Sequence, residues 1–238
     1  MPGSVSCNSM ADDWTLETID LGRVRYREAD ALQRKHHAEV VAGRQQSPAP
    51  QRLLLLEHDP AVITVSKRAG ADTNLLASPE HLASIGVDLE RTDRGGDVTW
   101  HGPGQLVAWP IVDLNRFGLG LHAWMRLMEQ AVIDTLAEFG IEGFRDDDAT
   151  GVWIPDDRDP RGAKICAMGV RVSKWVTLHG LALNVHPDLS QFGLIVPCGL
   201  LDRPVTSMKH AGREVELSRV QQVLQNQFSR LLSGSGVG

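Results

Sequence analysis

Residues 53–65, LLLLEHDPAVITV, indicate the architecture of the chain, because two apolar runs are separated by a turn signal. Short continuous apolar runs bounded by turn residues are typical of strands buried on both faces. The runs at 53–56 and 61–65 therefore predict two buried strands, broken at Asp59-Pro60.

Other parts of the chain predict a mixture of strands and helices. Three further strands are expected, the last two as a pair, at 106–114, 165–172 and 176–185. Apolar residues recur at helical spacing over 121–139, with Gly140 as a stop signal, and again over 220–231. Strands and helices do not alternate regularly. We therefore expect an α/β (α+β) fold, with a mixed sheet flanked by helices.

Length and composition indicate one ordinary globular domain. The chain has 238 residues, of which 42% are hydrophobic and 23% charged. We expect a disordered leader at 1–15, the functional domain at 16–232 and a disordered tail at 233–238. Met10 is an alternative start within the leader. The leader lacks the basic and apolar regions of a secretory signal.

Charge and cysteine content exclude several classes of protein. The formal net charge of −6 argues against general nucleic-acid binding, which needs a basic surface. No apolar stretch is long enough to span a membrane. Three scattered cysteines do not make a disulfide framework, so the expected compartment is the reducing cytoplasm.

Cys198 is the candidate nucleophile. It lies in LIVPCG at 194–199, where an apolar run ends in proline, thiol and glycine. Proline fixes the backbone angle before the thiol, and glycine lets a substrate approach closely. Free cysteines are more often buried as small apolar residues. On this segment alone, a displayed thiol and a packed thiol both remain open.

The segment RGGDVTWHGPGQ at 94–105 contains four glycines and a proline within twelve residues. It matches neither the nucleotide phosphate loop nor the dinucleotide fingerprint. The glycines would let the backbone lie against a ligand, with Arg94 and His101 at the ends of one stretch. The alternative is a pair of turns around a short strand at 98–100.

Two more stretches place small residues within strand-like sequence: AKICAMG at 163–169 and LHGLALN at 178–184. Glycine inside a strand indicates that something approaches closely. Lys164 opens the first stretch. A lysine in this position is commonly a solvated edge residue, but near a cysteine it can hold the thiol as thiolate. Cys166 is expected in the core, whereas His101 and His179 are the histidines best placed for a pocket.

Together, RGGDVTWHGPGQ, AKICAMG, LHGLALN and IVPCG resemble motifs of the lipoyl(octanoyl) transferases, also called lipoate-protein ligase B or octanoyl-[acyl carrier protein]:protein N-octanoyltransferase. The resemblance covers about residues 53–207, with the motifs in the family's order. It implies the fold shared by biotin protein ligases and lipoate-protein ligase A. It also implies an acyltransferase that moves an octanoyl group from octanoyl-acyl carrier protein to a lysine of a lipoyl domain.

Carried over by position, the resemblance places the acyl-thioester cysteine at Cys198 and the lysine that lowers its pKa at Lys164. The implied substrate-binding residues are Arg94, Gly95, Gly96, Asp97, Val98, Thr99, Trp100, His101, Ala167, Met168, Gly169, Gly180, Leu181 and Ala182. No cofactor and no metal are expected. The small residues at Ala167, Gly169, Gly180 and Ala182 would leave a slot for an alkyl chain.

The implied partners are octanoyl-acyl carrier protein, the lipoyl domains of 2-oxoacid dehydrogenase complexes and the glycine cleavage H protein. Acyl carrier proteins are acidic as a family, so a local basic patch would aid docking. The candidates, which otherwise are ordinary solvated charges, are Arg158, Arg161, Arg171, Lys174, Arg203 and Lys209.

Two other functions remain as alternatives. An ATP-dependent lipoate or biotin protein ligase of the same fold would need an adenylate site and no nucleophilic cysteine. A non-catalytic module that binds the carrier or the lipoyl domain would leave Cys198 unacylated. A metal enzyme is disfavoured, because the histidines and cysteines lack zinc-binding spacing.

Overall fold

A computed structural model describes residues 14–196 and 203–235. The elements in chain order are β1 (Trp14–Val24), α1 (Tyr26–Gly43), β2 (Ala49–His58), β3 (Val62–Ser66), η1 (Ala71–Asn74), α2 (Pro79–Ser84), β4 (Asp88–Thr92), β5 (Val98–His101), β6 (Gln105–Ile111), α3 (Leu121–Glu138), β7 (Phe144–Arg145), β8 (Val152–Asp156), β9 (Asp159–Ser173), β10 (Val176–Asn184), η2 (Leu189–Leu194) and α4 (Leu217–Ser235).

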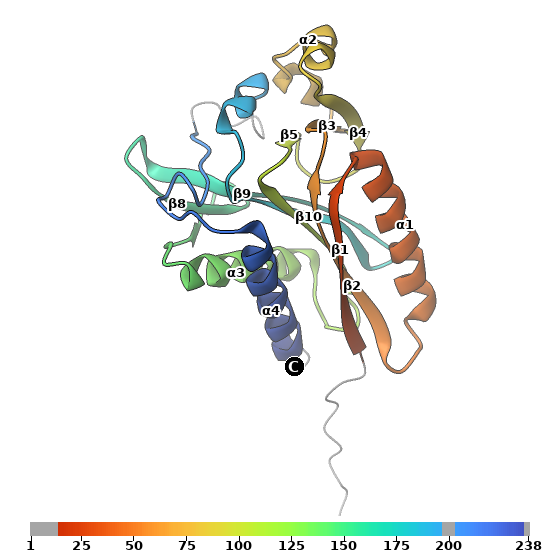
Figure 1. Cartoon of the computed structure of the whole chain (residues 1–238). Helices are drawn as coiled ribbons and strands as arrows, with labels where there is room; N and C mark the ends of the chain where they lie inside the picture. The colour runs from red at the N-terminus through yellow and green to blue at the C-terminus, as the bar shows by residue number, and fades with distance from the viewer. Residues whose placement is uncertain (1–13, 197–202, 236–238) are drawn as a thin grey trace, which may run out of the picture.

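Two sheets organise these elements (Figure 1). The large sheet has seven strands in the order β1-β2-β6-β10-β9-β8-β7, and the small sheet has the order β4-β3-β5. In the large sheet β1 and β2 are parallel and the other neighbours are antiparallel. The expectation of a mixed sheet flanked by helices is confirmed.

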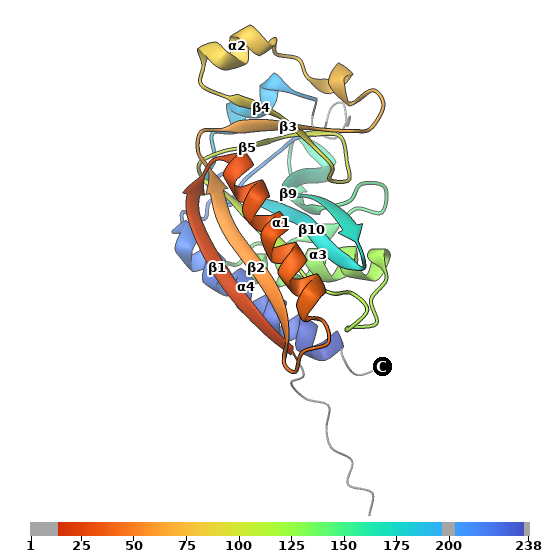
Figure 2. The same cartoon turned by 90° about the vertical axis from the view of Figure 1, so that its right-hand side faces the viewer.

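Helices cover both faces of the large sheet. Figure 2 shows α1 across one face, with α3 and α4 on the other. The leucines of β2 divide between the two faces, as the alternation of side chains along a strand requires. Leu53 and Leu55 join the core under α3 and α4, whereas Leu54 and Leu56 join the core under α1. This division explains why the run at 53–56 is apolar at every position.

The boundaries expected from the sequence need two corrections. β1 begins at Trp14, so Trp14 and Thr15 belong to a strand and not to the leader. α4 runs to Ser235, so it includes the first three residues of the expected tail. The helix expected over 121–139 is confirmed as α3, and Gly140 follows it in the left-handed conformation, with φ of 68°.

Small residues face each other across β9 and β10. The register pairs Gly169 with Gly180 and Ala167 with Ala182. A Cβ atom at Gly180 would lie 2.2 Å from the backbone oxygen of Ala108 on the neighbouring strand β6. At this position glycine is therefore required by the close approach of another strand, whatever ligand is bound.

Gly180→Ala should destabilise the fold by about 1–3 kcal/mol, because the added methyl meets backbone that cannot move aside alone. The measurement is the free energy of unfolding in urea. Gly193→Ala is the matched control, since a Cβ there has no neighbour within 4 Å. The control should stay within about 0.5 kcal/mol of the original chain. Equal stability of both variants would contradict the packing argument.

Candidate active site

A largely apolar pocket opens where the two sheets and α1 meet. Its floor is the patch of small residues on β9 and β10. Its deep wall is aromatic: the rings of Tyr26 and Trp109 lie edge to face with centroids 6.1 Å apart, and those of Trp109 and His179 lie 5.9 Å apart. The sequence-predicted residues that line it are Arg94, Gly96, Thr99, His101, Ala167, Met168, Gly169, Gly180, Leu181 and Ala182.

An adjoining cleft of about 410 Å³ shares Gly96, Met168 and Gly169 with this pocket. Two more of the expected substrate-binding residues, Gly95 and Asp97, line the cleft. Its other lining residues are Arg68, Leu121, Met125, Asp148, Ala149, Thr150, Lys164 and Val170. The pocket and the cleft therefore form a continuous lining from an apolar end to a polar end.

Val98 and Trp100 are the exceptions among the expected substrate-binding residues. Both are buried in the core of the small sheet, and neither lines the pocket or the cleft. They lie on β5, whose intervening residue Thr99 faces the pocket. The alternation of side chains along a strand accounts for the difference.

The loop that begins at Arg94 is held rigidly between the sheets. Arg94 donates through Nη2 to the Thr64 carbonyl at 2.8 Å and through Nε to Thr64 Oγ1 at 3.2 Å. The Gly95 amide donates to the Val170 carbonyl on β9 at 2.9 Å. A Cβ at Gly169 would lie 2.5 Å from the Gly95 oxygen. These two glycines therefore let the loop backbone dock on β9, a role different from the expected contact with a ligand.

Lys164 is buried, with 7% of its surface exposed, so it is not the solvated edge residue of the alternative interpretation. Its ammonium Nζ donates to the Thr150 carbonyl at 3.1 Å and lies 4.7 Å from the centroid of the Trp153 ring. It lines the cleft and also a smaller cavity next to it. A carbonyl and an aromatic face both favour a cation at this point.

Cys198 lies outside the described residues, but both flanks of its segment are anchored at the site. On one side the Val196 amide donates to the Asn74 carbonyl at 2.8 Å, and Asn74 Nδ2 donates to Asp97 Oδ2 at 2.7 Å. On the other side the Lys164 amide donates to the Pro204 carbonyl at 2.9 Å. The chain thus leaves the described structure beside Asp97 and returns beside Lys164.

Cys166 is the other cysteine near the site, and it is a core residue as expected. It is fully buried on β9. Burial raises the pKa of its thiol, and the nearby charge of Lys164 only partly opposes this. A neutral buried thiol is not a nucleophile.

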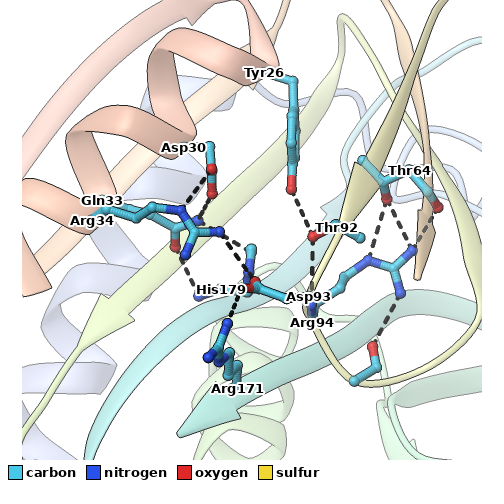
Figure 3. A network of polar contacts seen from close by, with 11 residues as sticks. Tyr26, Asp30, Gln33, Arg34, Thr64, Thr92, Asp93, Arg94, Arg171 and His179 are labelled. Carbon is cyan, nitrogen blue, oxygen red and sulfur yellow. Dashed lines mark hydrogen bonds and ion pairs between the residues drawn. The ribbon is translucent and has the colours of Figure 1, made fainter. Parts of the chain in front are cut away.

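Asp93, which the sequence did not single out, joins α1, β9 and β10 (Figure 3). Its carboxylate accepts from His179 Nε2 at 2.8 Å and from Arg34 Nη2 at 3.2 Å, and it pairs with Arg171. Burial acts to raise the pKa of Asp93, but the hydrogen bonds from His179 and Arg34 outweigh it. The pKa of Asp93 is therefore held well below its ordinary value.

Two buried histidines, His101 in the pocket lining and the adjacent His58, are neutral. Burial lowers the pKa of His58 to about 4, and a hydrogen bond to the Val24 carbonyl opposes this only in part. Burial and the neighbouring His58 lower the pKa of His101 well below its ordinary value. The two rings lie 5.5 Å apart. Both imidazoles are therefore uncharged at neutral pH.

The expected basic patch is mostly neutralised by acidic partners. Arg203 is the clearest correction, because its side chain is buried over the Trp153 ring, at 3.7 Å from the centroid. It pairs with Asp146 at 2.8 Å. The other paired candidates are Arg158 with Asp156, Arg161 with Asp159, Arg171 with Asp93 and Lys209 with Glu214. Lys174 is exposed. At the other five positions the described residues do not present a bare cationic surface.

Residues 14–196 and 203–235 contain no group of three or more His, Cys, Asp or Glu side chains that could hold a metal ion. Within the same ranges, every helix is too short or too polar to cross a membrane.

Comparison with protein families gives a match over most of the chain. The sequence model of the lipoyl protein ligase A/B catalytic domain matches residues 25–229. An octanoyltransferase of Solibacter usitatus is 46% identical, over 89% of this chain and 90% of that protein. An octanoyltransferase of Bacteroides thetaiotaomicron is 43% identical, over 90% of this chain and 94% of that protein. One of Porphyromonas gingivalis is 45% identical over 89% of this chain, which spans only 43% of that protein's length.

Solved structures resemble the fold at much lower identity. A lipoate-protein ligase A bound with ATP superposes with a TM-score of 0.66 at 18% identity, over 92% of this chain and 85% of that one. A bipartite lipoate protein ligase of Thermoplasma acidophilum superposes with a TM-score of 0.67 at 17% identity, over 93% of this chain and 84% of that one. A biotin protein ligase of Aquifex aeolicus with biotin and ATP superposes with a TM-score of 0.52 at 14% identity, over 90% of this chain and 69% of that one.

Asp93→Asn should destabilise the protein most at neutral pH and less in acid. A carboxylate whose pKa is lowered by folding adds stability above its unfolded pKa of about 3.9, and this stability is lost as pH falls toward the folded value. The measurement is the free energy of unfolding of both proteins at about pH 7 and about pH 3. The difference between them should shrink at the lower pH. A constant difference would show that the charge of Asp93 is unimportant.

Proposed function

The chain belongs to the family of lipoyl protein ligase A/B catalytic domains, and within it to the octanoyltransferases; on this premise we propose that it carries the octanoyl group as a thioester on Cys198, with Lys164 as its proton-transfer partner. The donor is octanoyl-acyl carrier protein. The acceptor is a lysine of a lipoyl domain in a 2-oxoacid dehydrogenase complex or in the glycine cleavage H protein.

The observation that carries this proposal is the anchoring of the described residues on both sides of Cys198. Val196 is hydrogen-bonded to Asn74, whose side chain binds Asp97 in the cleft. The same segment returns to pair with the backbone of Lys164. Both sides are therefore linked by hydrogen bonds to residues that line the cleft, Asp97 and Lys164. Cys198 is two residues from Val196, and two residues span at most about 7 Å.

The first half-reaction exchanges one thioester for another. The Cys198 thiolate, paired with cationic Lys164, attacks the octanoyl carbonyl, and the bond to the carrier sulfur breaks. The departing carrier thiolate takes a proton from Lys164. This exchange is close to energetic balance, so it needs no ATP. It leaves an octanoyl thioester on Cys198 and a neutral Lys164.

The second half-reaction makes an amide. The neutral amine of the acceptor lysine attacks the thioester carbon, the bond to Cys198 sulfur breaks, and Lys164 takes the proton lost by the amine. The products are an octanoyl-amide, a Cys198 thiolate and a cationic Lys164, so the enzyme is restored. An amide is more stable than a thioester, and this step runs downhill.

The apolar lining of the pocket supports its assignment to the octanoyl chain. Part of the lining is aromatic and aliphatic, and part is formed by small residues of β9 and β10. Burial contributes about 0.8 kcal/mol per methylene, so a chain of this length gains roughly 5 kcal/mol. That gain discriminates against much shorter acyl groups.

The ATP-dependent ligase is the alternative function. Relatives that are 43–46% identical to this chain are octanoyltransferases, whereas the ligases share only the fold, at 14–18% identity. Transfer assays with and without ATP distinguish the two functions. Octanoyl transfer that required ATP would overturn the thioester mechanism.

Cys198→Ser should abolish octanoyl transfer and leave the fold intact, because a hydroxyl is far less ionised than a thiol and attacks thioesters poorly. The assay follows transfer from octanoyl-acyl carrier protein to an apo lipoyl domain. Intact mass after incubation with the donor alone should show one added octanoyl group on the original chain. Cys166→Ser is the control and should still be acylated. Normal turnover by the Cys198 variant would refute the assignment.

Lys164→Ala should slow alkylation of Cys198 by iodoacetamide and cut transfer by on the order of 10²–10⁴, the usual range for a general acid–base group. Adding Cys198→Ala should cost little more, because residues that act as a unit are not additive. Lys164→Arg keeps the charge but cannot give up its proton. It should preserve alkylation and still fail in transfer. Normal alkylation and transfer by Lys164→Ala would exclude the pairing of these residues.

A further inference from the structure

A buried relay of hydrogen bonds runs from the pocket to the backbone of Lys164. His101 Nδ1 lies 2.7 Å from Gln105 Oε1, and Gln105 Nε2 donates to Asn184 Oδ1 at 2.9 Å. Asn184 Nδ2 donates to the Thr206 carbonyl at 2.9 Å, and the Thr206 amide donates to the Lys164 carbonyl at 2.9 Å. Gln105, Asn184 and Thr206 are almost completely buried.

The relay has a single allowed direction. The Thr206 carbonyl can only accept, so the Asn184 amide group must face it and the Asn184 oxygen must face Gln105. The Gln105 amide group therefore donates, and its oxygen is left to accept from His101. His101 must then carry its proton on Nδ1, with the lone pair on Nε2. Burial lowers the pKa of His101, so the ring is neutral and one tautomer is present.

His179, in the same pocket, is held in the opposite tautomer. Gln33 Oε1 accepts from the His179 backbone amide at 2.9 Å, so Gln33 Nε2 donates to His179 Nδ1 at 3.2 Å. His179 therefore carries its proton on Nε2 and donates it to Asp93. The two histidines thus provide an internal comparison for any measurement of tautomers.

Asn184 also anchors the segment that holds Lys164. Its backbone carbonyl accepts from the Met208 amide at 3.0 Å, while its side chain holds Thr206. In the same segment the Pro204 carbonyl accepts from the Lys164 amide, and the Thr206 amide donates to the Lys164 carbonyl. Asn184 and Lys164 line one small cavity. A shift of Thr206 would therefore move the backbone that aims Lys164 into the cleft.

We propose that Asn184 is a positioning residue, whose side-chain amide links the tautomer of His101 in the pocket to the placement of Lys164 by one directional hydrogen-bond relay. The proposal rests on the proposed function of Lys164 as the partner of Cys198. In this role Asn184 touches neither the acyl chain nor the thiol. It acts on Lys164 through the segment 204–206.

The first test uses the unaltered protein and does not depend on the folding of any variant. Nitrogen-15 NMR of the histidine side chains distinguishes Nδ1–H from Nε2–H. His101 should be the Nδ1–H tautomer and His179 the Nε2–H tautomer at neutral pH. An Nε2–H or doubly protonated His101 would overturn the relay.

The second test uses Asn184→Asp, which in its ionised form removes the donor to Thr206 and keeps the acceptor for Gln105. His101 should keep its tautomer, while alkylation of Cys198 and kcat of transfer should fall by about tenfold, equivalent to about 1.4 kcal/mol. KM should change little, because the pocket wall is preserved. Asn226→Asp makes the same chemical change on the exposed face of α4 and should leave both rates unchanged. Normal alkylation and kcat in a folded Asn184→Asp would overturn the positioning role.

Lys164→Ala is measured in parallel, so that the relay and the proposed function can be rejected separately. Slow alkylation in Lys164→Ala together with normal alkylation in Asn184→Asp would reject the relay and keep the proposed function. Normal alkylation in Lys164→Ala would reject the pairing with Cys198 itself. The NMR result then still decides whether the relay exists as a structural feature. Slow alkylation in both variants supports both proposals.

Discussion

The Asp93 carboxylate accepts hydrogen bonds and ion pairs from α1, β9 and β10, which are far apart in the sequence. It lies at the end of the small sheet, directly before the glycine-rich loop. One carboxylate therefore ties α1, β9 and β10 together beside the glycine-rich loop, and of its partners His179 lines the apolar pocket. Arg94, the next residue, ties the same loop back to the small sheet through Thr64. Together with the hydrogen bond from the Gly95 amide to the Val170 carbonyl, these two anchors fix the loop over β9.

The position of Lys164 depends on a second kind of constraint, the hydrogen bonds of its own backbone. Its amide and carbonyl both pair with the segment 204–206, and its ammonium is held by Thr150 and the Trp153 ring. The segment before Cys198 is anchored separately, through Asn74 and Asp97. The segment before the proposed nucleophile and the proposed proton partner Lys164 are thus held by two separate sets of hydrogen bonds.

The sequence predicted the parts of the fold in which burial is continuous. β2, β3, β6, β9 and β10 were evident as apolar runs, and α3 and α4 were evident from helical spacing. α1 was missed because it buries few apolar residues, and Gln33 is one of its fully buried positions. Asp93 was missed for a related reason: a lone aspartate between Thr92 and Arg94 carries no signal until its partners on α1, β9 and β10 are known. The glycines were noticed, but the sequence could not show that Gly95 and Gly169 face each other.

The floor of the pocket is made by the cross-strand pairs of glycine and alanine on β9 and β10, so it consists mainly of backbone. This limits how the chain-length preference of such a pocket can change by substitution. Every replacement at Gly169 or Gly180 adds volume, and none can deepen the floor. A wider pocket has to be made at its walls, where Tyr26, Trp109 and Met168 have side chains that can be shortened. Substitutions can therefore narrow this pocket at its floor or at its walls, but they can widen it only at its walls.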